Sequence, residues 1–132
     1  MQCTTRSVGV AMVGYGYWGP NLVRNLVESH SFHLVGLSEL NENRAREFSH
    51  RYPHVPVVRS LDDLLSMPDV EAVVVATPPS THFPLVARAL AADKHVLVEK
   101  PLAMCVEDAE ALVQMADERD VVLMPGHTFV YS

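Results

Sequence analysis

Apolar residues along this chain fall alternately into short unbroken runs and into helical spacings. The runs predict six strands, at residues 8–13, 32–37, 55–58, 70–76, 95–98 and 121–124. Spacings of three and four residues predict helices at residues 20–29, 41–51, 60–67, around 85–90 and 106–119. The run VEAVVVA at 70–76 is typical of a strand covered on both faces. The alternation predicts an α/β fold, doubly wound, with a mostly parallel sheet of about six strands.

Three glycines follow the first predicted strand and open the first helix. Gly14, Gly16 and Gly19 stand in the stretch GYGYWG, which has the spacing GxGxxG. In that context the first glycine permits a tight turn, the second lets the backbone approach a pyrophosphate, and the third lets the helix pack closely. Free amides at the helix start favour phosphate. The alternative is that the glycines serve turn geometry alone. The full pattern instead predicts a dinucleotide-binding Rossmann domain over residues 1–132.

An acidic residue completes the pattern at the end of the second predicted strand. Glu39 lies 20 residues after Gly19, where a carboxylate can accept both ribose hydroxyls of NAD. The same carboxylate would repel the 2′-phosphate of NADP, although Arg44 and Arg46 follow closely and soften that repulsion. We therefore expect NAD, with NADP less favoured.

The ends of the fourth and fifth predicted strands carry a second set of polar residues. Ligands bind beyond the carboxyl ends of the strands in such sheets. Lys100, in the stretch Glu99-Lys100-Pro101, suits a general base next to a positive nicotinamide ring, or it is an ordinary surface lysine. In the loop TPPSTH, Thr77, Pro78 and His82 would lie along the cofactor, and His82 is equally a helix-start residue without a ligand.

Composition and charge exclude several other classes. A net charge of −6 with ten scattered basic residues argues against binding a nucleic acid. The two cysteines form no CxxC and the seven histidines have no ligand spacing, so we expect no metal site. No apolar run approaches a membrane span of roughly 20 residues, and no secretory pattern opens the chain. We expect a cytoplasmic protein with no membrane partner.

Four motifs in combination carry a family resemblance. The stretches GYGYWGPN, ATPPSTH, EKPLA and GHTFVYS resemble the glucose–fructose oxidoreductase and inositol dehydrogenase (Gfo/Idh/MocA) family, and within it the bacterial nucleotide-sugar 3-dehydrogenases. The resemblance implies an NAD(P)-dependent oxidoreductase acting on a sugar or a related compound, with a Rossmann domain followed by a C-terminal α/β domain.

The resemblance also implies roles for individual residues. The pyrophosphate would lie on the three glycines and the amides of Tyr17 and Trp18, and Glu39 would hold the adenosine ribose, where Asp is commoner in the family. Thr77, Pro78 and His82 would line the dinucleotide, and Glu99 and the catalytic base Lys100 would lie at the nicotinamide ribose and the reacting carbon. His127, also expected to bind the cofactor, would lie near the start of the second domain and the active site. The Lys100–Pro101 bond is often cis in the family. Tyr15, Tyr17 and Trp18 are expected to pack their rings against neighbouring loops.

The end of the chain departs from the family pattern. Family enzymes carry most of the substrate site in the second domain, and this chain ends at FVYS, where that domain begins. We expect a C-terminal substrate and oligomerisation domain to be absent, and the chain alone to be inactive. A full-length form would act on a sugar or nucleotide sugar as a homo-oligomer. The alternatives are a stand-alone nucleotide-binding module, regulatory or docking, and a cofactor-free structural domain.

Overall fold

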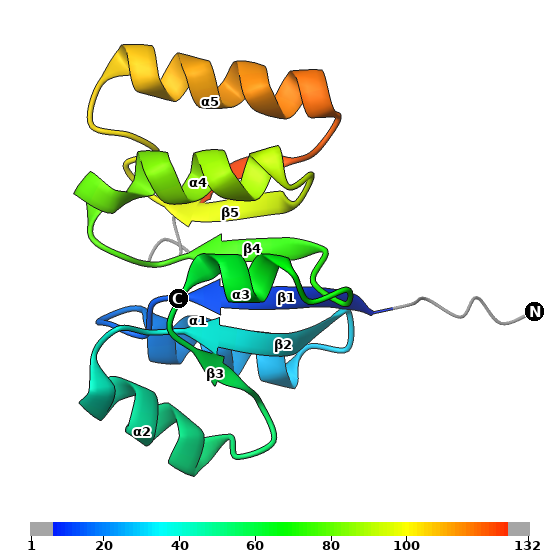
Figure 1. Ribbon diagram of the computed structural model, residues 1–132, viewed down its shortest axis with the longest axis vertical. Coiled ribbons are helices and arrows are strands. Elements are labelled where there is room, and N and C mark those ends of the chain that lie inside the picture. Colours follow the sequence, from blue (N-terminus) through cyan, green and yellow to red (C-terminus); the bar gives the residue numbers. More distant parts are fainter. Residues whose placement is uncertain (1–6, 127–132) are drawn as a thin grey trace, which may run out of the picture.

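Six strands alternate with helices along the chain, as Figure 1 shows. The computed structural model describes residues 7–126. The strands are β1 (Val8–Val13), β2 (Phe32–Ser38), β3 (Val57–Val58), β4 (Ala72–Val75), β5 (His95–Glu99) and β6 (Leu123–Gly126). The helices are α1 (Gly19–Glu28), α2 (Glu42–Arg51), α3 (Leu61–Leu65), α4 (His82–Ala91) and α5 (Val106–Arg119), with a 3₁₀ turn η1 (Pro79–Thr81) before α4.

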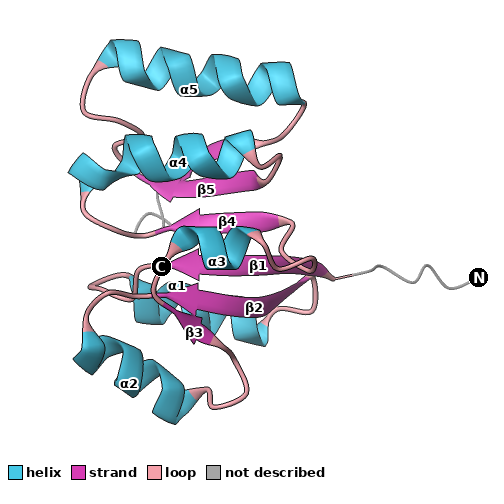
Figure 2. Ribbon diagram, viewed as in Figure 1, coloured by secondary structure: helices cyan, strands magenta, loops and turns pink. Residues whose placement is uncertain are grey.

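All six strands are parallel and form one sheet in the order β3-β2-β1-β4-β5-β6. In Figure 2 the arrowheads of β1, β2, β4 and β5 accordingly point the same way. The chain leaves β1 toward β2 on one side and returns to β4 on the other, so the direction of winding changes between β1 and β4. Ligands of open parallel sheets bind at such a switch point, beyond the carboxyl ends of the strands.

Helices cover both faces of the sheet, which explains why its strands are nearly all apolar. One buried cluster joins Ala11 and Val13 of β1 to residues of α3, α4 and α5. The other joins Val10 and Met12 of β1 to residues of α1 and α2, including the fully buried Phe48. Successive residues of β1 thus enter opposite clusters, because successive side chains of a strand point to opposite faces. The predicted doubly wound α/β fold is confirmed.

The predicted elements are all present, with small shifts at their ends. β4 is shorter than the predicted 70–76 run, because Val70 already lies in a turn where its N–H donates to Met67 O. Side chains cap the starts of two helices: Asn41 Oδ1 accepts from Arg44 N–H and Ser60 Oγ accepts from Asp63 N–H. Between residues 7 and 126, no helix has the length and apolar character needed to cross a membrane.

Candidate cofactor-binding site

A long hollow of about 900 Å³ lies beyond the carboxyl ends of the central strands, which is within the size range of small-molecule sites. It extends from the end of β2, at Glu39, past the β1–α1 loop to the end of β5, at Lys100. We call its two sides the glycine-loop wall (residues 14–19 and Glu39) and the lysine wall (Thr77, Pro78, Glu99 and Lys100). The predicted site residues that line it are Gly14, Gly16, Tyr17, Trp18, Glu39, Thr77, Pro78, Glu99 and Lys100.

The backbone at Gly14 requires glycine for reasons internal to the protein. Its φ is +96°, and a Cβ there would come within 2.5 Å of Ala76 O. Its own N–H donates to Ser38 O over 2.8 Å, which fixes the turn against the end of β2. Gly19 is also closely packed, since a Cβ there would lie 3.3 Å from Gly14 O. Gly14 therefore makes the tight turn that the GxGxxG spacing predicts.

Gly16 differs from its neighbours because no described residue comes close enough to demand a glycine there. A Cβ added to Gly16 would meet only the guanidinium of Arg44, at 3.6 Å, which is ordinary van der Waals contact. The residue lines the hollow. The missing side chain thus leaves the backbone accessible from the hollow itself, which is what a pyrophosphate lying on the loop requires.

Two backbone amides fix the carboxylate of Glu39. Tyr15 N–H donates to Oε1 over 2.7 Å, and Asn41 N–H donates to Oε2 over 2.8 Å. Glu39 itself lies directly after β2, so the glycine loop and the end of β2 hold one carboxylate between them. Because an ionised carboxylate has about four acceptor positions, both oxygens can still accept from ribose hydroxyls. The residues present therefore fit an adenosine ribose at this place.

The three aromatic side chains of the loop have different surroundings. Tyr15 is buried and packs edge-on against Phe48 of α2, with ring centroids 5.2 Å apart. Burial, and next the nearby Tyr52, raises the pKa of Tyr15 above its ordinary 10.0. Tyr17 is instead 85% exposed, and its ring meets Trp18 edge-on at the rim of the hollow. The expected packing holds for Tyr15, whereas Tyr17 remains largely uncovered.

Hydrogen bonds within the β4–α4 loop fix the direction of the Thr77 hydroxyl. Thr81 Oγ1 donates its one hydrogen to Pro78 O over 2.6 Å. Thr77 Oγ1 lies 2.6 Å from Thr81 Oγ1, so Thr77 must be the donor of that pair. The lone pairs of Thr77 Oγ1 are left to accept, and Thr77 lines the hollow. A ligand group that meets this oxygen must therefore donate.

Lys100 follows β5 at the far end of the hollow. The side of the hollow that contains Lys100 is formed by the carboxyl ends of β4 and β5. These strands pair in parallel, with Val75 opposite Val98. The Lys100–Pro101 peptide bond is cis, as the family resemblance implies. This arrangement places the one candidate base of the lysine wall beyond the sheet, at the opposite end of the hollow from Glu39.

Two predicted site residues do not line the hollow, and a third lies outside the part of the chain that the structure describes. Gly19 lies beneath the loop, against Gly14 and Tyr15. His82 is fully buried, with its ring nitrogens 2.6 Å from Pro101 O and 2.8 Å from Thr77 O. His127 lies outside the described residues. Cofactor contact by these residues stays a prediction.

Sequence reasoning missed several polar residues that the fold brings to the hollow. Arg59 and Ser60 follow β3, and Arg88 comes from α4, where it forms an ion pair with Asp62. The order of the strands would have identified Arg59 and Ser60, because β3 pairs in parallel with β2 and its carboxyl end lies at the same edge of the sheet. Arg44, noted beside Glu39, also lines the hollow.

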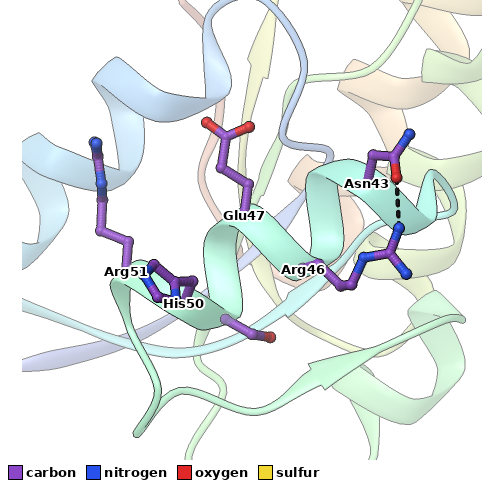
Figure 3. Close-up of a pocket in the computed structure, with 6 residues that line it drawn as sticks. Asn43, Arg46, Glu47, His50 and Arg51 are labelled. Carbon is purple, nitrogen blue, oxygen red and sulfur yellow. Dashed lines mark hydrogen bonds between the residues drawn. The ribbon is translucent and has the colours of Figure 1, made fainter.

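A second, shallow hollow lies on the outer surface of α2 alone. Figure 3 shows its lining side chains along this one helix, with Arg46 Nη2 donating to Asn43 Oδ1 over 2.6 Å. It includes His50, one of the histidines without ligand spacing. Within the described part of the chain, no three His, Cys, Asp or Glu side chains are grouped to hold a metal ion. The long hollow is thus the better candidate site.

Comparison with known proteins identifies the family. Residues 8–127 match the model of an oxidoreductase family described as an NAD-binding Rossmann fold, GFO_IDH_MocA. UDP-N-acetylglucosamine 3-dehydrogenase of Acidithiobacillus ferrooxidans is 40% identical over 94 residues, covering 71% of this chain and 29% of the relative. The 2,7-anhydro-N-acetylneuraminate hydratase of Mediterraneibacter gnavus is 36% identical over 124 residues, covering 92% of this chain and 32% of the relative. The chain thus spans about a third of the length of these relatives.

Solved structures agree in both fold and sequence. GenD2 from gentamicin A biosynthesis, in complex with NAD, superposes with a TM-score of 0.91 at 36% identity, covering 99% of this chain and 37% of that one. A mutant of KijD10, a 3-ketoreductase from Actinomadura kijaniata in complex with TDP-benzene and NADP, gives 0.87 at 30% identity, covering 96% and 40%. This chain belongs to the Gfo/Idh/MocA oxidoreductase family and carries its NAD-binding Rossmann domain.

Proposed function

We propose that the chain binds NAD(H) along the long hollow and forms the cofactor half of an oxidoreductase acting on a sugar or nucleotide-linked sugar. The observation that carries the proposal is Gly16, whose backbone is open to the hollow although the protein itself leaves room for a side chain. Glu39 stands on one side of it and Lys100 at the far end. This spacing supports an extended dinucleotide rather than a compact ligand.

The glycine-loop wall would hold the adenosine half. The amides of Tyr17 and Trp18, at the start of α1, face phosphate with a favourable helix dipole. Glu39, already oriented by Tyr15 N–H and Asn41 N–H, would accept from the ribose hydroxyls. A 2′-phosphate at the same place would meet the fixed carboxylate, although Arg44 lines the hollow nearby. We therefore propose a preference for NAD over NADP.

The lysine wall would hold the reacting half. Bound NAD supplies a hydride acceptor there. Lys100 Nζ would take the proton of the substrate hydroxyl, and Thr77 Oγ1 would accept a hydrogen bond, since its own hydrogen is given to Thr81. The names of relatives, a UDP-N-acetylglucosamine 3-dehydrogenase and a dTDP-sugar 3-reductase, support a nucleotide-linked sugar as the substrate. We also propose that the full-length form is a cytoplasmic homo-oligomer.

Calorimetric titration of the chain with NADH and with NADPH tests cofactor binding. We expect NADH to bind more tightly, because Glu39 meets the adenosine ribose. A folded sample that binds neither cofactor would refute the proposal, and tighter NADPH binding would refute the stated preference.

Turnover tests the catalytic part. We expect negligible activity from residues 1–132 alone, because positioning the substrate carbon against the cofactor is a large part of the rate, and these residues span about a third of the length of the relatives. A protein that extends this chain by the C-terminal domain of the family should produce NADH from a nucleotide-linked sugar. Robust turnover by the 132-residue chain would contradict this.

A redox-neutral reaction is the second candidate, because a relative 36% identical over 92% of this chain is named as a hydratase. The same extended protein distinguishes the two. A dehydrogenase accumulates NADH in proportion to product, whereas a hydratase forms product with no net change in absorbance at the nicotinamide band.

A further inference from the structure

His82 is a fully buried polar residue at the start of α4. Among the described residues, only Ser38 and His82 are polar and buried. Burying a polar ring is costly unless its hydrogen-bonding groups are satisfied. Its two partners therefore explain why the position holds a histidine.

Both ring nitrogens face groups that can only accept. Nδ1 lies 2.6 Å from Pro101 O, and Nε2 lies 2.8 Å from Thr77 O. A neutral imidazole has one donor nitrogen, and the tautomer decides which of the two carbonyls receives its hydrogen. In either tautomer the ring donates to one carbonyl and lies in close contact with the other.

The two carbonyls belong to different loops of the lysine wall. Thr77 follows β4, and Pro101 follows Lys100 at the end of β5. Thr77 and Lys100 both line the hollow, while His82 lies behind them and does not. The ring thus connects the backbone of Thr77, which lines the hollow, to Pro101, the residue directly after Lys100. The bonds among Thr77, Thr81 and Pro78 keep the first loop closed on itself.

We propose that His82 is a positioning residue: its ring, within hydrogen-bond distance of both Thr77 O and Pro101 O, clamps the β4–α4 loop to the Lys100–Pro101 segment and so fixes the backbone that carries Lys100. The clamp itself concerns only this chain. Its consequence, that Lys100 is held at the reacting end of a bound dinucleotide, rests on the proposed function. His82 would act through Lys100 without touching the ligand.

The chain offers an internal reporter for this clamp, because Lys94 and Lys100 are its only lysines. Labelling with ¹⁵N-lysine gives two assigned backbone amide signals in described residues. Lys94 directly precedes β5, at the opposite end of the strand from Lys100. Its backbone N–H donates to Ala89 O, so it takes no part in the hydrogen bonds of His82. Labelling with ¹⁵N-histidine gives the ring signals of His82 directly.

In the wild-type chain we expect a slowly exchanging ring N–H signal from His82, because its ring is fully buried. In His82→Phe, which keeps a planar ring and removes both ring nitrogens, we expect the Lys100 amide to shift and to exchange about tenfold faster, with Lys94 unchanged. His82→Gln, whose amide nitrogen has two hydrogens, should restore part of this protection. Lys94→Met, which removes the bond to Val70 O, should leave the Lys100 signal as in wild type.

A ring N–H of His82 that exchanges rapidly with solvent in the wild type would overturn the clamp, even if no His82 variant folds. Equal acceleration of Lys94 and Lys100 in His82→Phe, or no rescue by His82→Gln, would show a role in overall stability only. NADH titration of the same samples separates the two proposals. Because the adenosine contacts lie elsewhere, His82→Phe should bind NADH within about threefold of wild type. Absence of NADH binding by the wild type would refute the proposed function, while leaving the ring and exchange results to decide the clamp.

Discussion

The two walls of the hollow are held in place by different means. The glycine-loop wall is fixed mainly by backbone: a positive φ at Gly14, its N–H on Ser38 O, and two amides on the carboxylate of Glu39. The lysine wall is fixed by a side chain, since the ring of His82 lies between Thr77 O and Pro101 O, and Pro101 is 19 residues from His82 in the sequence. One wall can be read from residue spacing, whereas the other depends on the tertiary fold.

This difference suggests a division of labour between binding and reaction. A wall made of backbone contacts suits a constant partner such as a pyrophosphate. A wall joined by one buried ring sets the place of one reactive side chain, where small displacements have large effects on rate. Changes in the glycine-loop wall should therefore act on affinity or folding, and changes in the lysine wall on turnover.

The largest effect is expected at Lys100. In a protein that joins this chain to the family's C-terminal domain, Lys100→Ala should lower turnover by roughly 10²- to 10⁴-fold, the range for losing a general base. NAD affinity should stay within about threefold, because the adenosine contacts are untouched. Steady-state rates and a cofactor titration measure the two quantities. Lys94→Ala, the other lysine, is the control, and a fully active Lys100→Ala protein would contradict the assignment.

Gly14→Val should damage folding rather than binding as such. The φ of +96° strains any branched residue, and a Cβ would lie 2.5 Å from Ala76 O. We expect a loss of about 3 kcal/mol in the free energy of unfolding, or roughly 10 °C in the melting temperature. Thermal unfolding followed by circular dichroism measures it. A variant that melts with the wild type would mean that the turn tolerates a side chain.

Gly16→Val should give the opposite result in the same loop. Its Cβ meets only Arg44 at 3.6 Å, so the melting temperature without cofactor should remain near that of the wild type. NADH affinity should fall by about 100-fold or more, because the added side chain occupies the place of the pyrophosphate. Calorimetry against NADH provides the measurement. Unchanged affinity in a folded variant would move the cofactor away from the glycine loop.

Glu39→Gln should change cofactor selectivity more than affinity. Removing the charge relieves the repulsion of a 2′-phosphate, and removing one carboxylate oxygen weakens the ribose contact. We expect the preference for NADH over NADPH to narrow by about tenfold. Paired titrations give the ratio. Glu47→Gln, the same charge change on α2 outside the long hollow, is the control, and an equal change in both variants would indicate only a net-charge effect.

The strands and the glycine-loop wall were predictable because their signals are local. Hydrophobic runs located β1 within a residue, and the spacing from Gly19 located Glu39. β6 was placed two residues early, at 121–124. Asp120, in the left-handed conformation, ends α5 before the strand begins. The strand then includes Pro125, which is tolerated because β6 is an edge strand and needs no hydrogen bond on its outer side.

The lysine wall was predictable only in part. Position at a strand end found Thr77 and Lys100, yet no spacing rule joins His82 to Pro101, because their contact depends on how α4 packs over β5. Ser60 was missed for the same kind of reason, because it lines the hollow only through the pairing of β3 with β2. Residues whose role is set by strand order or by side-chain bonds to distant carbonyls lie beyond a one-dimensional pattern.

The smallest expected effect concerns Tyr15, which anchors the glycine-loop wall against Phe48. Burial raises the pKa of this phenol above 10.0, so the unfolded chain releases the proton at a lower pH than the folded one. The stability conferred by neutral Tyr15 is complete below pH 10 and is lost as the pH rises through the folded pKa. Tyr15→Phe, which keeps the ring and cannot titrate, should therefore lose less stability than wild type above that pH.

Urea midpoints at neutral pH and above pH 10 measure this difference. Tyr17→Phe removes a phenol that is 85% exposed and should follow the wild type, which controls for losing a hydroxyl as such. If the urea midpoint changed by the same amount between the two pH values in wild type and in Tyr15→Phe, the phenol would be exposed to solvent in the folded chain. The glycine-loop wall would then rest on its backbone contacts alone, which makes its contrast with the side-chain clamp of the lysine wall still stronger.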